Sequence, residues 1–327
     1  MKKRIIFIVL IAFVCTIASF GATVKRTILL HEGNLTQYDA SEWQKAITDA
    51  VAGDTVYFTS GVFYNDLTID KAITLIGAGI AETEAFYYNT EIGEVYAGCA
   101  KSDGESTTLD GNVTIAIPGA VTLTKTLMEG LRLQPGKSIT VTMPVTGLII
   151  KRCQITDYFG GSFSATETVT NLTLEQCFFN QVNCENFVSP DIHNCYIDKI
   201  YNVPNETNIR NCVTVEIWST TNCNFINCCY YYLTGSSFNN FKNCLYKNGD
   251  ANSEYPNSIN VEEPARYTKK QMEDSSYLGD DGSVIGPLGT TNPFTLIPAQ
   301  PYVTANNITY DSNTKKLNVS LTIKKGK

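Results

Sequence analysis

Hydrophobic and polar residues alternate along short stretches that are separated by clusters of glycine, aspartate and asparagine. Three such stretches follow one another near the start of the chain: TVYF at 55–58, SGVFYNDLTI at 60–69 and AITLIGAG at 72–79. Period-two alternation with many β-branched residues is typical of β-strands, and the polar clusters between them are typical of turns. The pattern therefore predicts a β-rich fold.

One segment, Ser41–Val51, has the spacing of an amphipathic helix instead. Its apolar residues share one face: Trp43, Ala46, Ile47 and Ala50. Ser41 is the expected N-cap, because its hydroxyl can accept a hydrogen bond from the first turn. We expect this helix to cover one end of the β-structure.

From about residue 147 the sequence repeats a short unit six times. The segments read LIIKRCQI, LTLEQCFF, PDIHNCYI, TNIRNCVT, NFINCCYY and NNFKNCLY. Their cysteines, at intervals of 24, 18, 17, 16 and 16 residues, are Cys153, Cys177, Cys195, Cys212, Cys228 and Cys244. An apolar residue stands three positions before each cysteine. The last four copies carry asparagine just before the cysteine: Asn194, Asn211, Asn227 and Asn243.

A unit of this length buries too little surface to fold alone and must stack on its neighbours. We therefore expect a solenoid in which each unit is one coil, with equivalent residues of successive coils about 4.8 Å apart. The apolar column would fill the interior. Asparagine tolerates a left-handed backbone, so the asparagine column is expected at a bend, with its amides bonded along the stack.

Residues 41–250 resemble the right-handed parallel β-helix proteins of the pectin-lyase-like superfamily. The resemblance rests on SEWQKAITDAVAGDTVYFTSGVFYNDLTIDKAITLIGAG, on the STTLDGN that follows, and on the Asn-Cys repeats. It implies an all-β solenoid with an N-terminal capping helix. The tail DGSVIGPLGTTNPFTLIPAQPYV with KKLNVSLTI is similar to the endings of secreted β-helix surface proteins of Bacteroidota.

This superfamily hosts lyases, hydrolases and binding proteins, so the resemblance does not fix an activity. Its hydrolases carry Asn-Thr-Asp and Gly-His-Gly motifs, and its pectate-lyase-like members carry Trp-Ile-Asp-His. None of these motifs is present here. The only adjacent aspartates, Asp280-Asp281, lie in a glycine-flanked turn far from the repeats.

The position two residues before each cysteine forms a further column. It carries Lys151, Glu175, His193, Arg210, Ile226 and Lys242, and alternation places it on the outside. In a lyase of this fold, a base removes a proton beside a uronate carboxylate that Ca²⁺ or a cation neutralises. Arg210 beside Glu175 is the candidate for that role, with His193 and Lys151 as weaker ones. We prefer a solvent-exposed ladder of alternating charge.

The stretch CCYYY, Cys228–Tyr232, belongs to the fifth copy. Alternation sends Tyr230 and Tyr232 to one side of the strand and Tyr231 to the other. The second position after the cysteine looks like the inner column, although the first position is also apolar and leaves the register open. We expect an exposed Tyr231, which is the candidate for stacking on a sugar ring.

Ten cysteines remain if Cys15 is removed with the N-terminal segment. We expect the six repeat cysteines to be reduced and buried, because stacked side chains that point the same way do not match the dihedral of a disulfide. Cys99, Cys184 and Cys223 lie outside the ladder and are the candidates for any disulfide. Two histidines and no Cys-x-x-Cys give no zinc signature, so we expect no metal or cofactor, with Ca²⁺ only in the case of a lyase.

The chain opens with three basic residues, an uncharged apolar run over Ile5–Ile17, and Ser19 and Gly21. This predicts a signal peptide over 1–21 and a location in the periplasm, on the outer cell surface or outside the cell. Its removal takes three positive charges and changes the net charge from −7 to −10. We therefore expect no nucleic-acid partner and, since no second long apolar segment exists, no membrane span.

We expect the β-helix over 22–264 and a distinct C-terminal segment over 265–327. This segment is rich in glycine and ends in a hairpin around Asp311-Ser312-Asn313. It would cover the open end of the solenoid. The alternative is a small module for surface attachment.

These features favour a non-catalytic secreted or cell-surface protein that contacts polysaccharide along an elongated face. One alternative is a polysaccharide lyase or glycoside hydrolase. The other is a structural or adhesive spacer.

Overall fold

The computed structural model describes residues 26–80, 88–89, 94–95, 106–119, 121–162, 168–264, 269–291, 293–294, 302–311 and 316–324. The expected signal peptide, with Cys15, lies outside these residues, and so does Cys99. No helix in the described parts of the chain is long and apolar enough to cross a bilayer.

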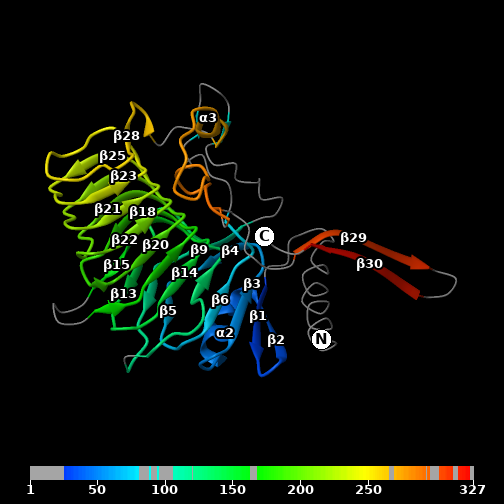
Figure 1. The fold of residues 1–327 in the computed structure, drawn as a ribbon. Coiled ribbons are helices and arrows are strands. Elements are labelled where there is room, and N and C mark those ends of the chain that lie inside the picture. Colours follow the sequence, from blue (N-terminus) through cyan, green and yellow to red (C-terminus); the bar gives the residue numbers. More distant parts are fainter. Residues whose placement is uncertain are drawn as a thin grey trace.

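Two long sheets, built mostly from parallel strands, make up the body of the molecule (Figure 1). The first sheet contains, in spatial order, β2 (Asn34–Asp39), β1 (Arg26–His31), β3 (Thr55–Phe58), β6 (Thr74–Ile76), β11 (Met128–Glu129), β14 (Ile149–Lys151), β17 (Thr173–Glu175), β20 (Asp191–His193), β22 (Asn208–Arg210), β24 (Asn224–Ile226) and β26 (Asn240–Lys242). Only β1 pairs antiparallel in this sheet, with β2 and β3.

The second sheet faces the first. Its main path contains β28 (Ile259–Asn260), β27 (Leu245–Tyr246), β25 (Cys229–Thr234), β23 (Val213–Trp218), β21 (Tyr196–Tyr201), β18 (Phe178–Asn183), β15 (Gln154–Gly161), β12 (Leu131–Leu133), β9 (Thr107–Asp110) and β4 (Gly61–Tyr64). Beside this path lie β13 (Ile139–Val141), β10 (Val113–Ile115) and β5 (Leu67–Ile69). The chain alternates between the two sheets, so each coil contributes a strand to both. The arrangement is consistent with a β-helix-like fold.

The remaining elements are short or lie at the ends of the chain. They are the 3₁₀ turn η2 (Ala40–Glu42), the helices α2 (Trp43–Asp49) and α3 (Lys269–Asp274), and the strand pairs β16 (Val169–Thr170) with β19 (Phe187–Val188), β7 (Tyr88–Asn89) with β8 (Glu94–Val95), and β29 (Tyr302–Asp311) with β30 (Lys316–Lys324). The antiparallel pair β29–β30 confirms the hairpin expected at the C-terminus.

The N-terminal helix forms where the apolar spacing predicts it, but it begins differently. Trp43, Ala46 and Ile47 are buried, as expected. Ser41 is not an N-cap, because it lies inside the 3₁₀ turn that precedes α2. The Trp43 indole N–H donates to the carbonyl of Tyr64 at 3.0 Å, which attaches the helix to the second sheet.

The residue before each repeat cysteine adopts a left-handed backbone in all six copies. The φ angles lie between 49° and 55° at Arg152, Gln176, Asn194, Asn211, Asn227 and Asn243. This confirms the expected bend, and its preference for asparagine follows from the steric cost of positive φ. Further positive-φ residues recur at two other positions of the coil: Asn171, Ser189, Glu206, Asn222 and Phe238, and Asn202, Ser219 and Gly235. The coil therefore has three sharp corners.

The repeat extends beyond the six copies found in the sequence. Met128-Glu129-Gly130-Leu131 pairs in register with the first copy, and Gly130 has φ 66°. Tyr255-Pro256-Asn257-Ser258 follows the last copy, with φ 56° at Asn257. The Ser258 hydroxyl there takes the place of the thiol and accepts from the Cys244 N–H at 2.9 Å. The sequence pattern did not identify these two copies. Gly130 replaces the asparagine in the first of them, and Ser258 replaces the cysteine in the second.

The core consists of stacked columns from both sheets. The column three residues before the cysteines is fully buried, and its last members form an aromatic stack in which Phe225, Phe241 and Tyr255 lie 4.8 and 5.2 Å apart. Burying a side chain of this size contributes roughly 1.5–3 kcal/mol. Tyr255 thus continues the core into the last coil.

The repeat cysteines line the core as free thiols. All six are buried and unpaired, as expected. The backbone N–H groups of four of them, Cys153, Cys177, Cys212 and Cys228, meet the sulfur of the next coil, for example Cys212 N to Cys228 Sγ at 3.4 Å. Cys184 and Cys223 are free as well. Burial raises the pKa of the Cys223 thiol to about 11, and it raises the pKa values of Cys195 and Cys244 well above the ordinary range.

The strand after each cysteine does not alternate regularly, and the expectation for the three tyrosines is partly wrong. Tyr230 is fully buried in the core, as expected. The strand pairing skips Tyr231, so both Tyr231 and Tyr232 lie outside the core, with ring centroids 6.2 Å apart. Tyr231 is only 8% exposed, whereas Tyr232 is 46% exposed.

A C-terminal segment, residues 277–291 with 293–294, lies along the asparagine corner. Asn194 Nδ2 donates to the Pro287 carbonyl at 3.2 Å, Gln176 Nε2 donates to the Pro293 carbonyl, and Asn243 Nδ2 bonds Asp280. The expected amide-to-amide bond is seen from Asn243 to Asn227, at 3.5 Å. The side-chain amides of Gln176, Asn194 and Asn243 thus bond to the C-terminal segment.

The same segment covers the apolar column that directly follows the cysteines. That column includes Phe178, Tyr196, Val213, Cys229 and Leu245, and it packs against Met272, Val284, Ile285 and Phe294. The Tyr196 and Phe294 rings meet edge-on at 5.1 Å. This second apolar cluster explains why two adjacent positions of the repeat are both hydrophobic. Whether 265–327 is a distinct domain stays a prediction.

We predict that the nine described cysteines resist alkylation in the native protein, because burial removes access to their thiols. In denaturant without reductant all nine should react with iodoacetamide, as counted by mass spectrometry. A pair that reacts only after reduction would contradict free thiols in the ladder.

We predict a pH-dependent contribution from His31, whose Nδ1 lies 3.0 Å from Asp54 Oδ1. This hydrogen bond raises the pKa of His31 above 6.5. The stabilisation is therefore complete below about pH 6.5 and is lost as pH rises through the raised pKa. The thermal midpoint of His31→Gln should fall below that of the wild type at about pH 5 and match it at about pH 9. An equal difference at both pH values would contradict this account.

Candidate functional site

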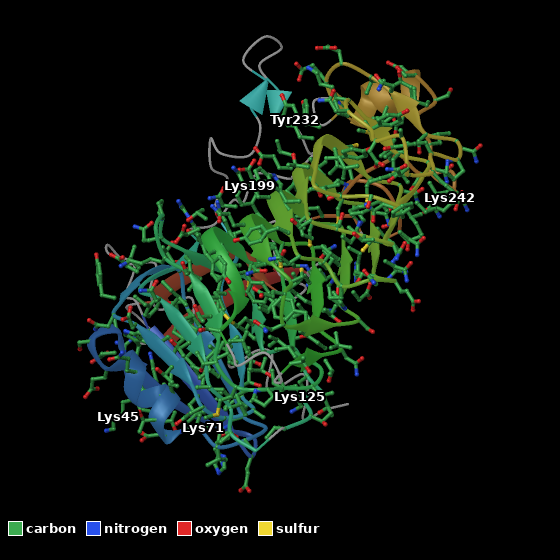
Figure 2. All side chains as sticks on the ribbon, turned by 90° about the vertical axis from the view of Figure 1, so that its left-hand side faces the viewer. Lys45, Lys71, Lys125, Lys199, Tyr232 and Lys242 are labelled. Carbon is green, nitrogen blue, oxygen red and sulfur yellow. The ribbon has the colours of Figure 1, made fainter. Side chains whose placement is uncertain are left out.

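Two outer faces carry side chains that could contact a ligand. Figure 2 shows Lys242 on one side of the stack and Lys199 and Tyr232 on another. Lys242 is the last residue of β26 in the first sheet, and the other two residues lie on the second sheet. The two faces differ in chemistry.

The first face carries the charged column. Its members are Glu129, Lys151, Glu175, His193, Arg210, the apolar Ile226, and Lys242. The strand register places Lys151 beside Glu175, Glu175 beside His193 and His193 beside Arg210. The structure thus brings together all four catalytic candidates. It also adds Glu129, which the sequence did not reveal because its coil lacks the Asn-Cys signature.

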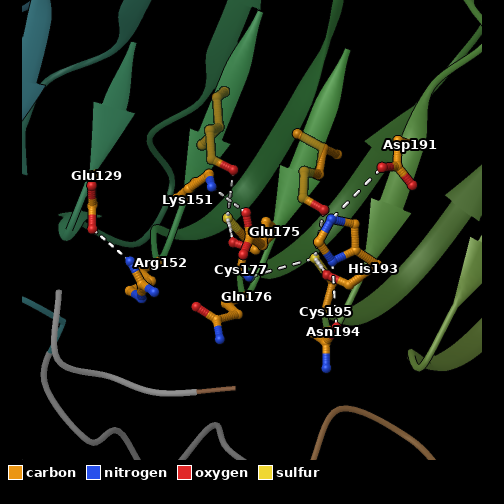
Figure 3. Close-up of polar contacts among 12 residues, drawn as sticks. Glu129, Lys151, Arg152, Glu175, Gln176, Cys177, Asp191, His193, Asn194 and Cys195 are labelled. Carbon is orange, nitrogen blue, oxygen red and sulfur yellow. Dashed lines mark hydrogen bonds and ion pairs between the residues drawn. The ribbon is translucent and has the colours of Figure 1, made fainter. Parts of the chain in front are cut away.

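Members of this column form ion pairs with one another or with charged residues beside the column (Figure 3). Lys151 pairs with Glu175. Burial alone would raise the pKa of Glu175, but the hydrogen bond and charge of Lys151, with His193 and Arg152 nearby, hold it below its ordinary value. Glu175 is therefore an ionised partner for a cation and is poorly suited to act as a general acid.

His193 and Arg210 share one carboxylate. Arg210 Nη2 donates to Asp191 Oδ1 at 2.7 Å, and His193 Nε2 lies 3.7 Å from Asp191 Oδ2. Lys242 Nζ lies 2.6 Å from Asp280 Oδ2 on the C-terminal segment. Each cation of the column thus has a carboxylate partner, which is what a charge ladder requires and is unfavourable for a catalytic base.

A buried ion pair lies at the corner beside this column. Arg152 Nη1 lies 2.6 Å from Glu129 Oε1, and the two side chains are 7% and 14% exposed. No group of three His, Cys, Asp or Glu side chains in the described ranges could hold a metal ion.

We call the second face the aromatic face. It is formed by two neighbouring columns of side chains on β15, β18, β21, β23 and β25. One column contains Tyr158, Gln181, Lys199, Glu216 and Tyr232, and the other contains Gly160, Asn183, Tyr201, Trp218 and Thr234. Tyr201 and Trp218 are direct neighbours, and Trp218 is 42% exposed.

Hydrogen bonds between the two columns fix the positions of these rings. Tyr201 Oη donates to Gln181 Oε1 at 3.3 Å, and Trp218 Nε1 donates to Glu216 Oε2 at 2.8 Å. Asn183 Nδ2 donates to Tyr158 Oη at 3.4 Å. The hydroxyl or indole N–H of Tyr158, Tyr201 and Trp218 is thereby bonded to a polar neighbour on the same face.

Gly160 has a specific part in this arrangement. A Cβ atom at this position would overlap the Tyr158 ring. Glycine therefore lets the Tyr158 ring lie flat across the neighbouring column.

Tyr231, the residue expected to stack on a sugar, does not belong to the aromatic face. Its ring is packed in the second apolar cluster, and its hydroxyl donates to Glu263 Oε2 at 2.8 Å. The expectation that it is exposed is wrong, because the chain that follows the repeats covers it. The sequence analysis did not identify Tyr158, Tyr201, Trp218 or Tyr232. The last three lie four or six residues after a repeat cysteine. Tyr158 lies five residues after Cys153, because the strand register shifts just before it.

Comparisons with protein-family models, with curated proteins and with solved structures found no match. The chemistry of the two outer faces is therefore the basis for a functional proposal.

We predict that Arg152 and Arg210 differ sharply in their contribution to stability. Arg152→Met leaves Glu129 buried without this cation and should lower the free energy of unfolding by about 3–5 kcal/mol. Arg210→Met breaks an exposed pair, with side chains 46% and 43% exposed, and should cost no more than about 1 kcal/mol. Urea denaturation measures both variants, and equal losses would contradict the assignment of the buried pair.

Proposed function

We propose that the protein is a non-catalytic, secreted or cell-surface right-handed parallel β-helix of the pectin-lyase-like type that binds polysaccharide on its aromatic face. The alternation of the chain between two in-register sheets and the three corners per coil support the fold. The basic and apolar N-terminal segment supports secretion.

The observation that carries this proposal is the pair of adjacent, partly exposed rings Tyr201 and Trp218, with Tyr232 on the next strand. Aromatic rings held rigidly on a surface bury large area at low entropic cost, and their faces suit the C–H face of a sugar ring. Beside them, Asn183, Gln181 and Glu216 present amide and carboxylate groups that can bond sugar hydroxyls. This is the usual composition of a carbohydrate-binding surface.

The lyase alternative depends on the charged column. Each of its candidate bases has a carboxylate partner: Lys151 pairs with Glu175, and His193 and Arg210 share Asp191. A base in β-elimination must be available to take a proton. The pairing supports a structural use of the column over a catalytic one.

We predict that Trp218→Ala weakens retention on a bound polysaccharide at least tenfold, or about 1.4 kcal/mol, because the variant loses the most exposed ring of the adjacent pair. Affinity electrophoresis through gels that contain single polysaccharides measures this effect. The matched control is Phe238→Ala, which removes a more exposed ring (62%, against 42% for Trp218) from a corner outside the aromatic face.

Three outcomes decide between the candidate functions. Retention that Trp218→Ala abolishes and Phe238→Ala leaves intact supports the proposal. If both variants are retained as strongly as the wild type, the polysaccharide binds to a surface other than the aromatic face. Release of unsaturated uronide or new reducing ends, lost in Arg210→Ala, would overturn the proposal and establish a lyase or hydrolase at the charged column.

A further inference from the structure

The aromatic face is long and straight, which restricts the shape of a ligand. Its strands pair in register from Tyr158 to Tyr232 through Gln181, Lys199 and Glu216. Five strands give four intervals of about 4.8 Å, or about 19 Å in all. A ligand that contacts both terminal tyrosines must therefore be extended and must lie across the strands, along the direction in which the coils stack.

The charges on this face restrict the ligand further. Its two charged side chains, Lys199 and Glu216, are neighbours in register and form an ion pair at 3.3 Å. Asp157 and Asp198 directly precede Tyr158 and Lys199 on the same strands. The face therefore offers no uncompensated cation, and the whole chain carries a net charge of −7. A polyanion would be repelled here, whereas an uncharged chain would not.

The distribution of rings sets the number of contacts. Tyr158 and Tyr232 stand at the two ends, and Tyr201 and Trp218 stand between them in the neighbouring column. The amide and carboxylate groups of Asn183, Gln181 and Glu216 lie among the rings. A chain of sugar rings laid along this face would meet a ring at each end and a ring with a hydrogen-bonding partner in the middle.

We infer that the aromatic face binds a neutral, unbranched glycan over about four or five consecutive sugar units, laid across β15, β18, β21, β23 and β25. This inference rests on the proposed function and adds the charge class, the orientation and the length of the bound segment. The terminal rings Tyr158 and Tyr232 define the ends of the site. The central rings Tyr201 and Trp218 hold the middle of the chain.

The two tryptophans of the chain make the test direct. Trp43 is buried at 3% exposure, so a ligand-induced change in tryptophan fluorescence reports on Trp218. The full chain is titrated with neutral oligosaccharides of two to about seven units, in β-1,4-linked and α-1,4-linked gluco-series and a manno-series, and with oligogalacturonates of equal length. In at least one neutral series the affinity should rise with length and become constant at about four or five units. Oligogalacturonates should bind at least tenfold more weakly at low salt, with the difference reduced at high salt.

Variants at the ends of the face separate this inference from the proposed function. Tyr158→Ala and Tyr232→Ala should each weaken a pentasaccharide at least tenfold and leave a disaccharide unchanged, whereas Trp218→Ala should weaken both. Both tyrosine variants should elute from a size-exclusion column at the same volume as the wild type, which excludes misfolding.

Equal or tighter binding of oligogalacturonates, or an affinity that is already constant at two units, would overturn the inference and leave polysaccharide binding at this face standing. If no glycan of either charge class alters Trp218 fluorescence or is retained by the protein, the proposed function fails and the inference fails with it.

Discussion

The in-register stacking of coils is the constraint on which the rest of the structure depends. Each strand bonds to the equivalent strand of the next coil, so a side chain at any position has its counterparts about 4.8 Å above and below it. A column must then be compatible with itself. Apolar columns fill the core, thiols stack beside backbone N–H groups, and each charge in a column needs a partner of opposite sign close by. Lys151 has Glu175 in its own column, and Arg210 has Asp191 on the preceding strand.

The same constraint accounts for the difference between the two outer faces. On the first face, charged neighbours satisfy one another, and the corner amides hold the C-terminal segment. On the second face, the bend of the strand after Tyr230 turns two successive residues outward. In the fifth copy these two residues are Tyr231, which is covered, and Tyr232, which remains exposed. The exposed rings are therefore a product of the coil geometry, and they lie in rows because the coils do.

Much of the fold was predictable from the repeat. Its spacing indicated stacked strands, the apolar position indicated the core, and the asparagines indicated a left-handed corner, which the φ angles confirm. Strict alternation failed at Tyr231, because the strand pairing skips that residue and periodicity carries no sign of the skip. The position of the C-terminal segment along the corner could not be foreseen either, since it depends on Phe294 meeting Tyr196, about a hundred residues away. The repeat predicted the charged column. It did not predict the aromatic face, because the rings of that face are divided between two columns, and neither column has an aromatic residue in every coil.

Side-chain footprinting with hydroxyl radicals, with and without a retained neutral polysaccharide, tests the central claim most directly. It reports the solvent exposure of each aromatic and histidine side chain in the intact protein. The account predicts that the polysaccharide protects Tyr158, Tyr201, Trp218 and Tyr232 and leaves Tyr64 and Phe238, exposed at 58% and 62%, as reactive as before. Protection at His193 with none at Trp218 would contradict it and move the ligand to the charged column.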